Sequence, residues 1–191
     1  MFRAIDHEEV KVSDAVKVQC LQAFDGCELQ QLADVTIDCV EGGASIGFML
    51  PMTRDKADTF WRNAAASAAR GEREVLVAYD AGTIVGTVTV VLAQPENQPH
   101  RADIAKMQVH RRARRRGIGE ALLVAAQRRA RDAGKTLLVL DTASDDAERL
   151  YVRQGWQFCG RIPNYALFPD GRPCATNVFF KSLDAMTDAD R

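Results

Sequence analysis

Hydrophobic and polar positions along the chain follow two different periods, which predict a mixture of helices and strands. Five segments carry apolar residues mostly at intervals of three and four, the spacing of a helix with one buried face. These segments cover residues 13–24, 28–40, 53–70, 118–133 and 144–154. Ser13 and Thr53 are placed to cap the start of two of them, and Gly134 is placed to cap the end of the fourth.

The remaining apolar segments are short and predict strands. Residues 74–79 and 83–93 are rich in Val, Ile and Thr and are joined through 80–82 (DAG), which is typical of a β-hairpin. Further strands are predicted over 103–109, 136–140, 156–160 and 176–183. There is no internal repeat and no linker. We therefore expect one domain over 1–191, of mixed α/β (α+β) class, whose sheet has helices on both sides.

The charge balance gives no global attraction to nucleic acid or to an anionic membrane. The chain has 25 Lys+Arg against 26 Asp+Glu and a formal net charge of -1. No apolar run approaches the roughly 20 residues that a membrane span needs, and the first residues reach an acid before a signal-peptide core can form. The sequence therefore predicts a cytoplasmic protein that binds neither membranes nor nucleic acid.

Cysteine and histidine usage predicts neither a disulfide framework nor a metal site. The five cysteines are odd in number and lack a C-x-x-C pair, and the three histidines are scattered. Cys159 and Cys174 are candidates for a covalent acyl-cysteine step. Because neither stands beside a histidine or at a helix start, we expect buried, inert thiols instead.

The most informative stretch is HRRARRRGIG at 110–119, which lies between a predicted strand and an amphipathic helix. The first N–H groups of a helix lack intrahelical partners, and glycines let an anion approach the backbone. The spacing is neither that of a dinucleotide fold nor that of a P-loop. We expect an anion-binding loop formed by Arg114, Arg115, Arg116, Gly117, Ile118, Gly119 and Glu120. The alternatives are a solvated charge run and a nucleic-acid patch.

Two motifs in this order resemble the GNAT superfamily of acetyl-CoA-dependent N-acetyltransferases. R-x-x-G-x-G at 114–119 resembles its pyrophosphate-binding signature, and A-x-x-L-Y at 147–151 followed by Gly-Trp at 155–156 resembles its next helix and strand. The resemblance implies acetyl-CoA as co-substrate and a mixed, mostly antiparallel sheet flanked by helices. Ser144 stands where many members have an Asn that contacts the cofactor, and it can make only part of those contacts.

Longer stretches resemble the tabtoxin-resistance branch of this superfamily. They are GGASIGFM at 42–49, RADIAKM at 101–107, LDT at 140–142 and PDGRPCATNVFFKSL at 169–183. This resemblance implies a small amine acceptor, amino-acid-like or toxin- or antibiotic-like, rather than a protein tail. The segments 42–52, 94–102 and 163–173 are candidates to line the acceptor site.

Acetyl transfer to an amine needs a base, an acid and stabilisation of the oxyanion. Tyr151 is neutral at physiological pH, since a phenol has a pKa of about 10, and a positioned phenol can donate a proton to the thiolate as it leaves; the resemblance implies the same role. Asp103 and Asp141 lie on predicted neighbouring strands and can hold one water as the base, although Asp141 also suits a helix cap. In the family, backbone N–H groups freed by a bulge bind the oxyanion, which implies Met107, Gln108 and Val109.

These residues predict direct attack of the amine in a ternary complex. Transfer of a longer acyl chain is the alternative among enzymes, and a non-catalytic acyl-CoA sensor is the alternative outside them. A nucleic-acid binder using 111–116 would lack the aromatic side chains that usually accompany such a patch. The sequence is compatible with a homodimer and does not determine the oligomeric state.

Overall fold

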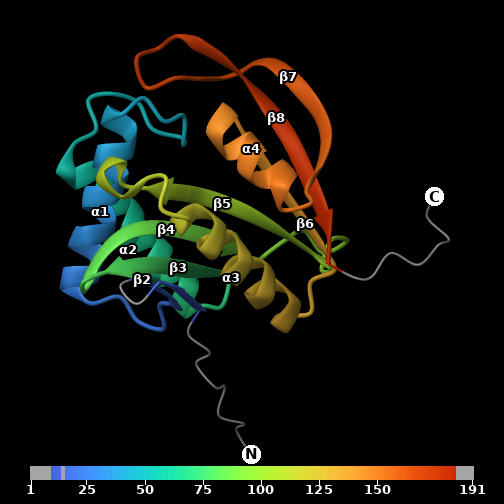
Figure 1. The fold of residues 1–191 in the computed structure, drawn as a ribbon, viewed down its shortest axis with the longest axis horizontal. Coiled ribbons are helices and arrows are strands. Elements are labelled where there is room, and N and C mark those ends of the chain that lie inside the picture. Colours follow the sequence, from blue (N-terminus) through green and yellow to red (C-terminus); the bar gives the residue numbers. More distant parts are fainter. Residues whose placement is uncertain (1–9, 14–15, 184–191) are drawn as a thin grey trace, which may run out of the picture.

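The computed structural model describes residues 10–13 and 16–183 (Figure 1). The strands are β1 (Val10–Ser13), β2 (Val16–Cys20), β3 (Arg73–Asp80), β4 (Thr83–Val91), β5 (Arg101–Val109), β6 (Leu137–Thr142), β7 (Gln157–Leu167) and β8 (Pro173–Ser182). The helices are α1 (Gly26–Glu41), α2 (Arg54–Ala69), α3 (Ile118–Asp132), α4 (Asp145–Arg153) and one short 3-10 turn (Arg111–Ala113).

The described strands form one mixed sheet in the order β1-β2-β3-β4-β5-β6-β8-β7. β5 and β6 are parallel, and every other described pair is antiparallel. A parallel pair needs a crossover connection, and α3 supplies it. The mixed, mostly antiparallel sheet expected from the resemblance is confirmed.

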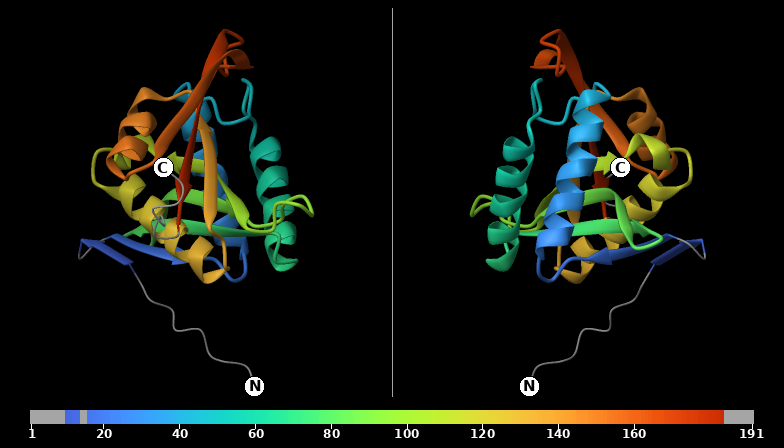
Figure 2. Two further views of the ribbon diagram at one scale, coloured as in Figure 1. Left: turned by 90° about the vertical axis from the view of Figure 1, so that its right-hand side faces the viewer. Right: turned by 90° about the vertical axis from the view of Figure 1, so that its left-hand side faces the viewer.

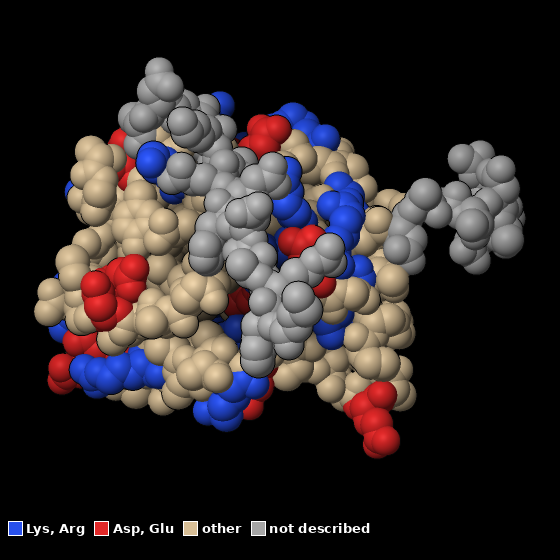
Figure 3. Space-filling model, turned by 90° about the horizontal axis from the view of Figure 1, so that it is seen from below, with Lys and Arg blue, Asp and Glu red and all other residues tan. Residues whose placement is uncertain are grey.

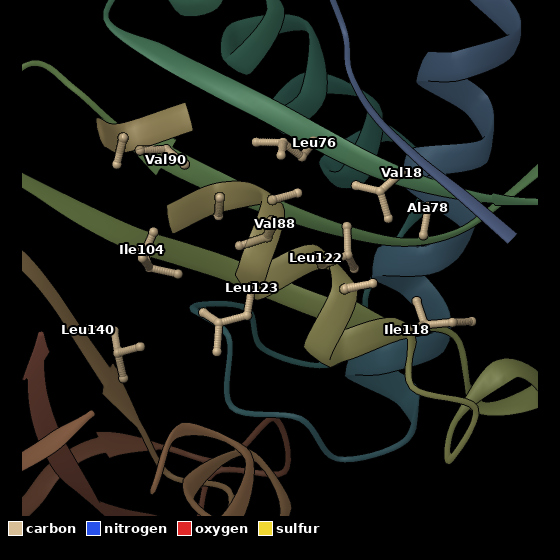
Figure 4. Close-up of a cluster of buried hydrophobic side chains, with 14 of the residues drawn as sticks. Val18, Leu76, Ala78, Val88, Val90, Ile104, Ile118, Leu122, Leu123 and Leu140 are labelled. Carbon is tan, nitrogen blue, oxygen red and sulfur yellow. The ribbon is translucent and has the colours of Figure 1, made fainter. Parts of the chain in front are cut away.

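Helices cover both faces of the sheet (Figure 2). On one face, α1 and α2 pack through Leu32, Val35 and Trp61 against Val75 and Val77 of β3. The other face carries α3, whose apolar stripe lies over the central strands (Figure 4); the stripe and its partners include Ile118, Leu122, Leu123, Leu76, Val88, Val90, Ile104 and Leu140. Burial of these two apolar layers is the main driving force for the fold.

The parallel strands β5 and β6 are paired at one end only and then diverge, which leaves an opening between them that we call the split. β5 and β6 pair only at Arg101↔Leu137, Ala102↔Leu138 and Asp103↔Val139. Beyond Asp103, β5 continues to Val109, while β6 turns with β8 in another direction (Figure 1). The backbone of β5 facing this split therefore lacks a strand partner on its β6 side.

A bulge interrupts β5 beside the split. Thr87 of β4 pairs with Gln108 and Thr89 pairs with Ala105, so β5 has one extra residue between these positions. Because side chains alternate along a strand, one extra residue exchanges the two faces. Before the bulge, Ala102 and Ile104 face α3; after it, the odd positions Met107 and Val109 pack on that side and Gln108 faces α1.

Most predicted elements are present within one to three residues of their expected ends, and Thr53 and Ser144 cap α2 and α4. The predicted helix over 13–24 is wrong, because Val16–Cys20 is strand β2 and pairs with β3. Val16 and Val18 alternate with exposed residues, which buries both valines on one face of the sheet. Valine is stiff at χ1 and favours strands, so pairing with β3 prevailed over the weak helical pattern. Positions 14–15 lie outside the described residues.

The last hairpin is longer than expected. β7 extends the predicted strand 156–160 to Leu167, and β8 begins at Pro173 rather than at 176. The segment 163–173 is therefore partly strand. Between Ile162↔Thr176 and Ala166↔Cys174 three residues of β7 face one of β8, and Asn164 within this irregularity has a φ of +51°.

A buried polar chain joins α2, α1 and β5. Trp61 Nε1 donates to Thr36 Oγ1 at 2.9 Å, and Thr36 Oγ1 donates to Gln108 Oε1 at 2.9 Å. All three residues are buried. The chain fixes the two helices relative to the bulged end of β5, because a polar group buried without a partner is costly.

Replacing Thr36 by Val keeps the volume but removes the hydroxyl. Trp61 Nε1 and Gln108 Oε1 then lose their partner, and at roughly 1–3 kcal/mol for each orphaned group the free energy of unfolding falls by about 3 kcal/mol. Urea denaturation measures this loss. The control Thr36→Ser keeps the hydroxyl and loses one methyl, at about 1 kcal/mol. Equal losses in the two variants would contradict a role for the polar chain.

Candidate active site

The start of α3 is open to an anion. Its N-cap residue is Gly117, with a φ of +76° and no side-chain capping hydrogen bond. Arg115 also has a left-handed φ of +64°. The first N–H groups of the helix therefore have no capping side chain, and the helix dipole favours negative charge at this end. The predicted order of strand, arginine-glycine loop and helix is confirmed.

The arginines before Gly117 have individual partners. Arg111 Nε lies 2.9 Å from Asp38 Oδ1, and Arg116 Nη1 lies 2.7 Å from Asp80 Oδ2. The hydrogen bond from Arg116 lowers the pKa of Asp80. Because these guanidinium groups are neutralised by neighbouring carboxylates, the run is not one free basic patch, which weakens the nucleic-acid interpretation.

Within the described ranges, Arg114 and Arg115 are not held by a carboxylate at such short distances. Arg114 Nε donates to the carbonyl of Val109 at 3.1 Å, which ties the loop to the end of β5. The Arg115 side chain is 84% exposed and lies 3.7 Å from Asp146 at the start of α4. Such an exposed pair is worth little in stability and leaves the guanidinium available to a ligand. On the face seen from below, basic and acidic side chains are interspersed (Figure 3).

The other predicted residues of this loop have distinct environments. The Ile118 side chain is buried in the core, so only its backbone can serve a ligand. A Cβ on Gly119 would lie 3.3 Å from Leu150, so glycine here permits close packing of α4 on α3. Glu120 accepts a hydrogen bond from Gln154 at 2.7 Å, and Ser144 accepts one from the Ala147 N–H as the N-cap of α4.

Tyr151 lies on α4 and is buried at the split between β5 and β6. Its ring contacts Trp156 and Phe179 at centroid distances of 5.9 and 6.0 Å. No hydrogen bond to its hydroxyl is present in the described part of the chain. Burial, and secondly the charge of Asp141, raise the pKa of this phenol above its ordinary value. The group therefore keeps its proton at neutral pH.

The two candidate base residues lie on one face of the sheet, since the neighbouring Ala102, Ile104, Leu138 and Leu140 all face α3. Asp103 accepts from Arg101 Nη1 at 2.8 Å and from Gln94 Nε2 at 3.1 Å. Asp141 accepts from Thr176 Oγ1 at 2.9 Å and is exposed. Each carboxylate thus has its own hydrogen bonds, and Asp141 has the freer oxygen.

Lys106 lies at the β5 bulge and was not among the predicted site residues. Its Nζ donates to the carbonyl of Ile46 at 2.8 Å and lies 5.6 Å from the Phe48 ring centroid and 5.7 Å from that of Phe60. Burial lowers the pKa of Lys106, and the charge of Asp141 partly offsets this effect. A signal was present in the sequence, because a lysine stands in phase with the buried Ala102 and Ile104.

Two of the three predicted acceptor segments meet beyond the end of β5. The Leu50 N–H donates to the carbonyl of Pro169 at 3.0 Å, and Ser45 Oγ donates to that of Leu167 at 3.1 Å. The third segment, 94–102, lies at the opposite end of β5. There Lys135 Nζ donates to the carbonyl of Pro99 at 2.8 Å, beside the end of α3. The segment nevertheless contacts one candidate base, because Gln94 and Arg101 both donate hydrogen bonds to Asp103.

The expectation of two buried thiols holds for Cys174 and is wrong for Cys159, which is exposed. Cys159 belongs to β7, an edge strand that exposes most of its side chains, and pairing with one neighbour cannot bury it. Among residues 10–13 and 16–183, no group of three or more His, Cys, Asp or Glu side chains is arranged to hold a metal ion. No helix in these ranges is long and apolar enough to cross a membrane.

Residues 46–156, more than half of the chain, match the model of the acetyltransferase (GNAT) family. The chain belongs to this family. This GNAT protein is 28% identical over 128 residues to an uncharacterized N-acetyltransferase in the hisH-hisA intergenic region of Azospirillum brasilense, covering 66% of this chain and 74% of the relative.

Solved structures share the fold of this GNAT protein. The putative acetyltransferase yncA from Salmonella typhimurium, solved with acetyl-CoA, has a TM-score of 0.73 at 18% identity, over 93% of this chain and 99% of that one. The ribosomal-protein-alanine N-acetyltransferase from Brucella melitensis has a TM-score of 0.71 at 22% identity, over 86% and 98%. As a GNAT-family N-acetyltransferase, the protein transfers an acetyl group from acetyl-CoA to an amine.

Proposed function

We propose that this GNAT enzyme acetylates the primary amine of a small molecule, amino-acid-like or toxin- or antibiotic-like, by direct attack in a ternary complex. The observation that carries the proposal is the split between β5 and β6. The bulge of β5 lies beyond its last pair with β6, and Asp141 lies on β6 beyond the same pair. The charge of Asp141 acts on the Tyr151 phenol, and α3, with its uncapped start, connects the two strands. The resemblance of four segments to the tabtoxin-resistance branch supports the class of acceptor.

The residues present fit acetyl-CoA. An N-terminus of α3 without a capping side chain suits the diphosphate, with the N–H groups of Gly117, Ile118, Gly119 and Glu120 as donors. Arg114 and Arg115 supply charge, whereas the Arg116 guanidinium is paired with Asp80. Met107, Gln108 and Val109 follow the bulge, where unpaired backbone groups of β5 suit the pantetheine arm and the thioester carbonyl. Ser144 lies at the start of α4, on the far side of the split.

The proposed reaction needs two proton transfers at opposite sides of the thioester. A water held by Asp141, with Asp103 at the base of the split, removes a proton from the acceptor ammonium. The free amine attacks the thioester carbonyl, so that a C–N bond forms and the C–S bond breaks. Tyr151 then gives its proton to the departing thiolate; the raised pKa keeps the phenol protonated until that step.

A covalent step on cysteine is the less supported route. Cys174 is buried beside Ser45, with its Sγ 3.5 Å from Ser45 Oγ, and Cys159 is exposed on the edge strand. Neither thiol lies at a helix start or beside a histidine in the described residues, which are the usual means of making a thiolate.

Thermal unfolding with acetyl-CoA, paired with thiol detection, tests the proposed function. A ligand at 100 times its Kd adds about 2.7 kcal/mol of stability, which for a domain of this size raises the Tm by roughly 5–10 °C. We expect this rise with acetyl-CoA and none with a DNA oligonucleotide. Small primary amines should then release CoA thiol, whereas peptide amines should not.

Three outcomes contradict parts of the proposal. An equal Tm rise with DNA would indicate a generic anion patch. A rise without thiol release from any amine would indicate a non-catalytic sensor. Faster thiol release from longer acyl-CoA substrates would assign a different acyl donor.

A further inference from the structure

Lys106 occupies a strained backbone position on the acceptor side of the split. Its φ is +51°, in the left-handed region that residues other than glycine rarely adopt. The residue stands at the bulge where β5 gains one residue against β4. Strain of this kind is costly and concentrates at functional sites, which directs attention to the Lys106 side chain.

The Lys106 ammonium group is enclosed but has no directly bound anion. It lies over the adjoining Phe48 and Phe60 rings, and a Cβ on Gly47 would approach its Nζ to 3.2 Å. Its single hydrogen-bond acceptor among the described residues is the carbonyl of Ile46. No carboxylate within 10–13 or 16–183 approaches it to 4.0 Å. An ammonium group with three donors therefore retains donors for a ligand.

A ring of contacts connects this cation to the Asp141 carboxylate. From Ile46 the chain continues to Ser45, whose Oγ lies 3.5 Å from Cys174 Sγ. Two residues further along β8, Thr176 donates to Asp141 at 2.9 Å. The charge of Asp141 acts in turn on Lys106. One cation and one anion thus lie on the same ring without forming an ion pair.

We infer that Lys106 and Asp141 form a subsite for a zwitterionic acceptor, in which Lys106 holds a carboxylate of the substrate and Asp141 receives its amine. This inference rests on the proposed function and narrows it to small amines that carry an acid group. A partly buried cation without a directly bound anion is unfavourable, and a substrate carboxylate supplies that contact. The two fixed charges also select against simple amines, which would leave the cation unpaired.

The inference can be tested on the wild-type enzyme with pairs of acceptor amines. The two members of a pair have the same side chain, and only one of them has an α-carboxylate. Suitable pairs are tyrosine with tyramine and ornithine with putrescine, in which the second member lacks the carboxylate. A charge-assisted contact of roughly 1.5–3 kcal/mol corresponds to about 10- to 100-fold. We expect the preferred pair to show a kcat/KM at least 10-fold higher for the member that has the α-carboxylate.

Variants of Lys106 assign that preference to its charge. Lys106→Met removes the charge and should reduce the carboxylate preference about 10-fold, and Lys106→Arg should retain most of it. The control Lys181→Met removes another partly buried lysine, whose Nζ donates to the carbonyl of Gln154 beside α4. Lys181 lies on the opposite face of β8 from Thr176, so its variant should keep the preference.

Four other results would contradict the inference or the proposed function. Loss of kcat/KM by the same factor for both members of a pair in Lys106→Met would mean that the lysine only pins the loop at 44–49. Should Lys106→Met fail to fold, equal rates for the paired acceptors in the wild-type enzyme would by themselves overturn the inference. Turnover of tyramine and putrescine alone would overturn the inference and leave the proposed function intact. A Tm rise with acetyl-CoA but no turnover of any amine would overturn both.

Discussion

Replacing Tyr151 by Phe will lower the turnover number about 100-fold or more, the usual range for loss of a general acid. The phenol is buried between Trp156 and Phe179, and only its oxygen is removed, so the packing of α4 is kept. The Kd for acetyl-CoA should stay within a factor of two. Steady-state kinetics and calorimetric titration measure the two quantities separately.

Tyr79→Phe is the matched control for this variant. Tyr79 donates to Glu28 at 2.8 Å in the α1 layer, remote from the split, and its loss should leave the turnover number unchanged. Unchanged turnover in Tyr151→Phe would reject the acid role. A fall in acetyl-CoA affinity equal to the fall in turnover would show that the hydroxyl positions the cofactor instead.

The pH dependence follows from the same environment. Burial and the nearby Asp141 charge raise the pKa of the Tyr151 phenol, so its proton is retained to a higher pH than that of a free phenol near pH 10. The turnover number of the wild-type enzyme should therefore show no alkaline decline between about pH 7 and 10. A decline within that interval that is absent from Tyr151→Phe would mean that the phenol has an ordinary or lowered pKa.

Gly117→Val will weaken acetyl-CoA binding roughly 10- to 100-fold, which corresponds to the loss of one or more charge-assisted hydrogen bonds of roughly 1.5–3 kcal/mol. Gly117 has a φ of +76° at the N-cap of α3, where the added side chain both strains the backbone and intrudes on the bound diphosphate. Calorimetric titration with acetyl-CoA measures the change.

The other end of the same helix offers a control for the backbone strain. Gly134 has a φ of +73°, and a Cβ built there meets nothing within 4 Å. Gly134→Val should therefore lose a similar amount of stability, on the order of 1–2 kcal/mol, while its Kd for acetyl-CoA stays the same. Equal weakening of binding in both variants would mean that strain in α3, rather than contact with the diphosphate, is responsible.

The elements that depend only on residues close together in the sequence could be predicted from the sequence. The β3–β4 hairpin follows from two Val- and Thr-rich runs around Gly82, and α2 starts where Thr53 caps it. The order of β5, the arginine-glycine loop and α3 was likewise legible, because glycine at a left-handed position and an amphipathic helix are local properties.

Sequence reasoning failed where two segments distant along the chain compete for the same residues. Residues 16–20 have a weak helical pattern, yet they form β2 because β3 offers a strand edge on which Val16 and Val18 are buried.

The sequence by itself determined helices α1 to α4, the central hairpin, the arginine-glycine loop before α3 and the choice of candidate acid, since each depends on residues within a few positions of one another. Tertiary structure alone decided which side chains meet at the split. The bulge of β5 exchanges the two faces of the strand after Ala105, which turns Gln108 toward Thr36, while Lys106 at the bulge meets the loop at 46–48. A single extra residue in the pairing with β4 causes this exchange, and such a register is fixed only when both strands pack together.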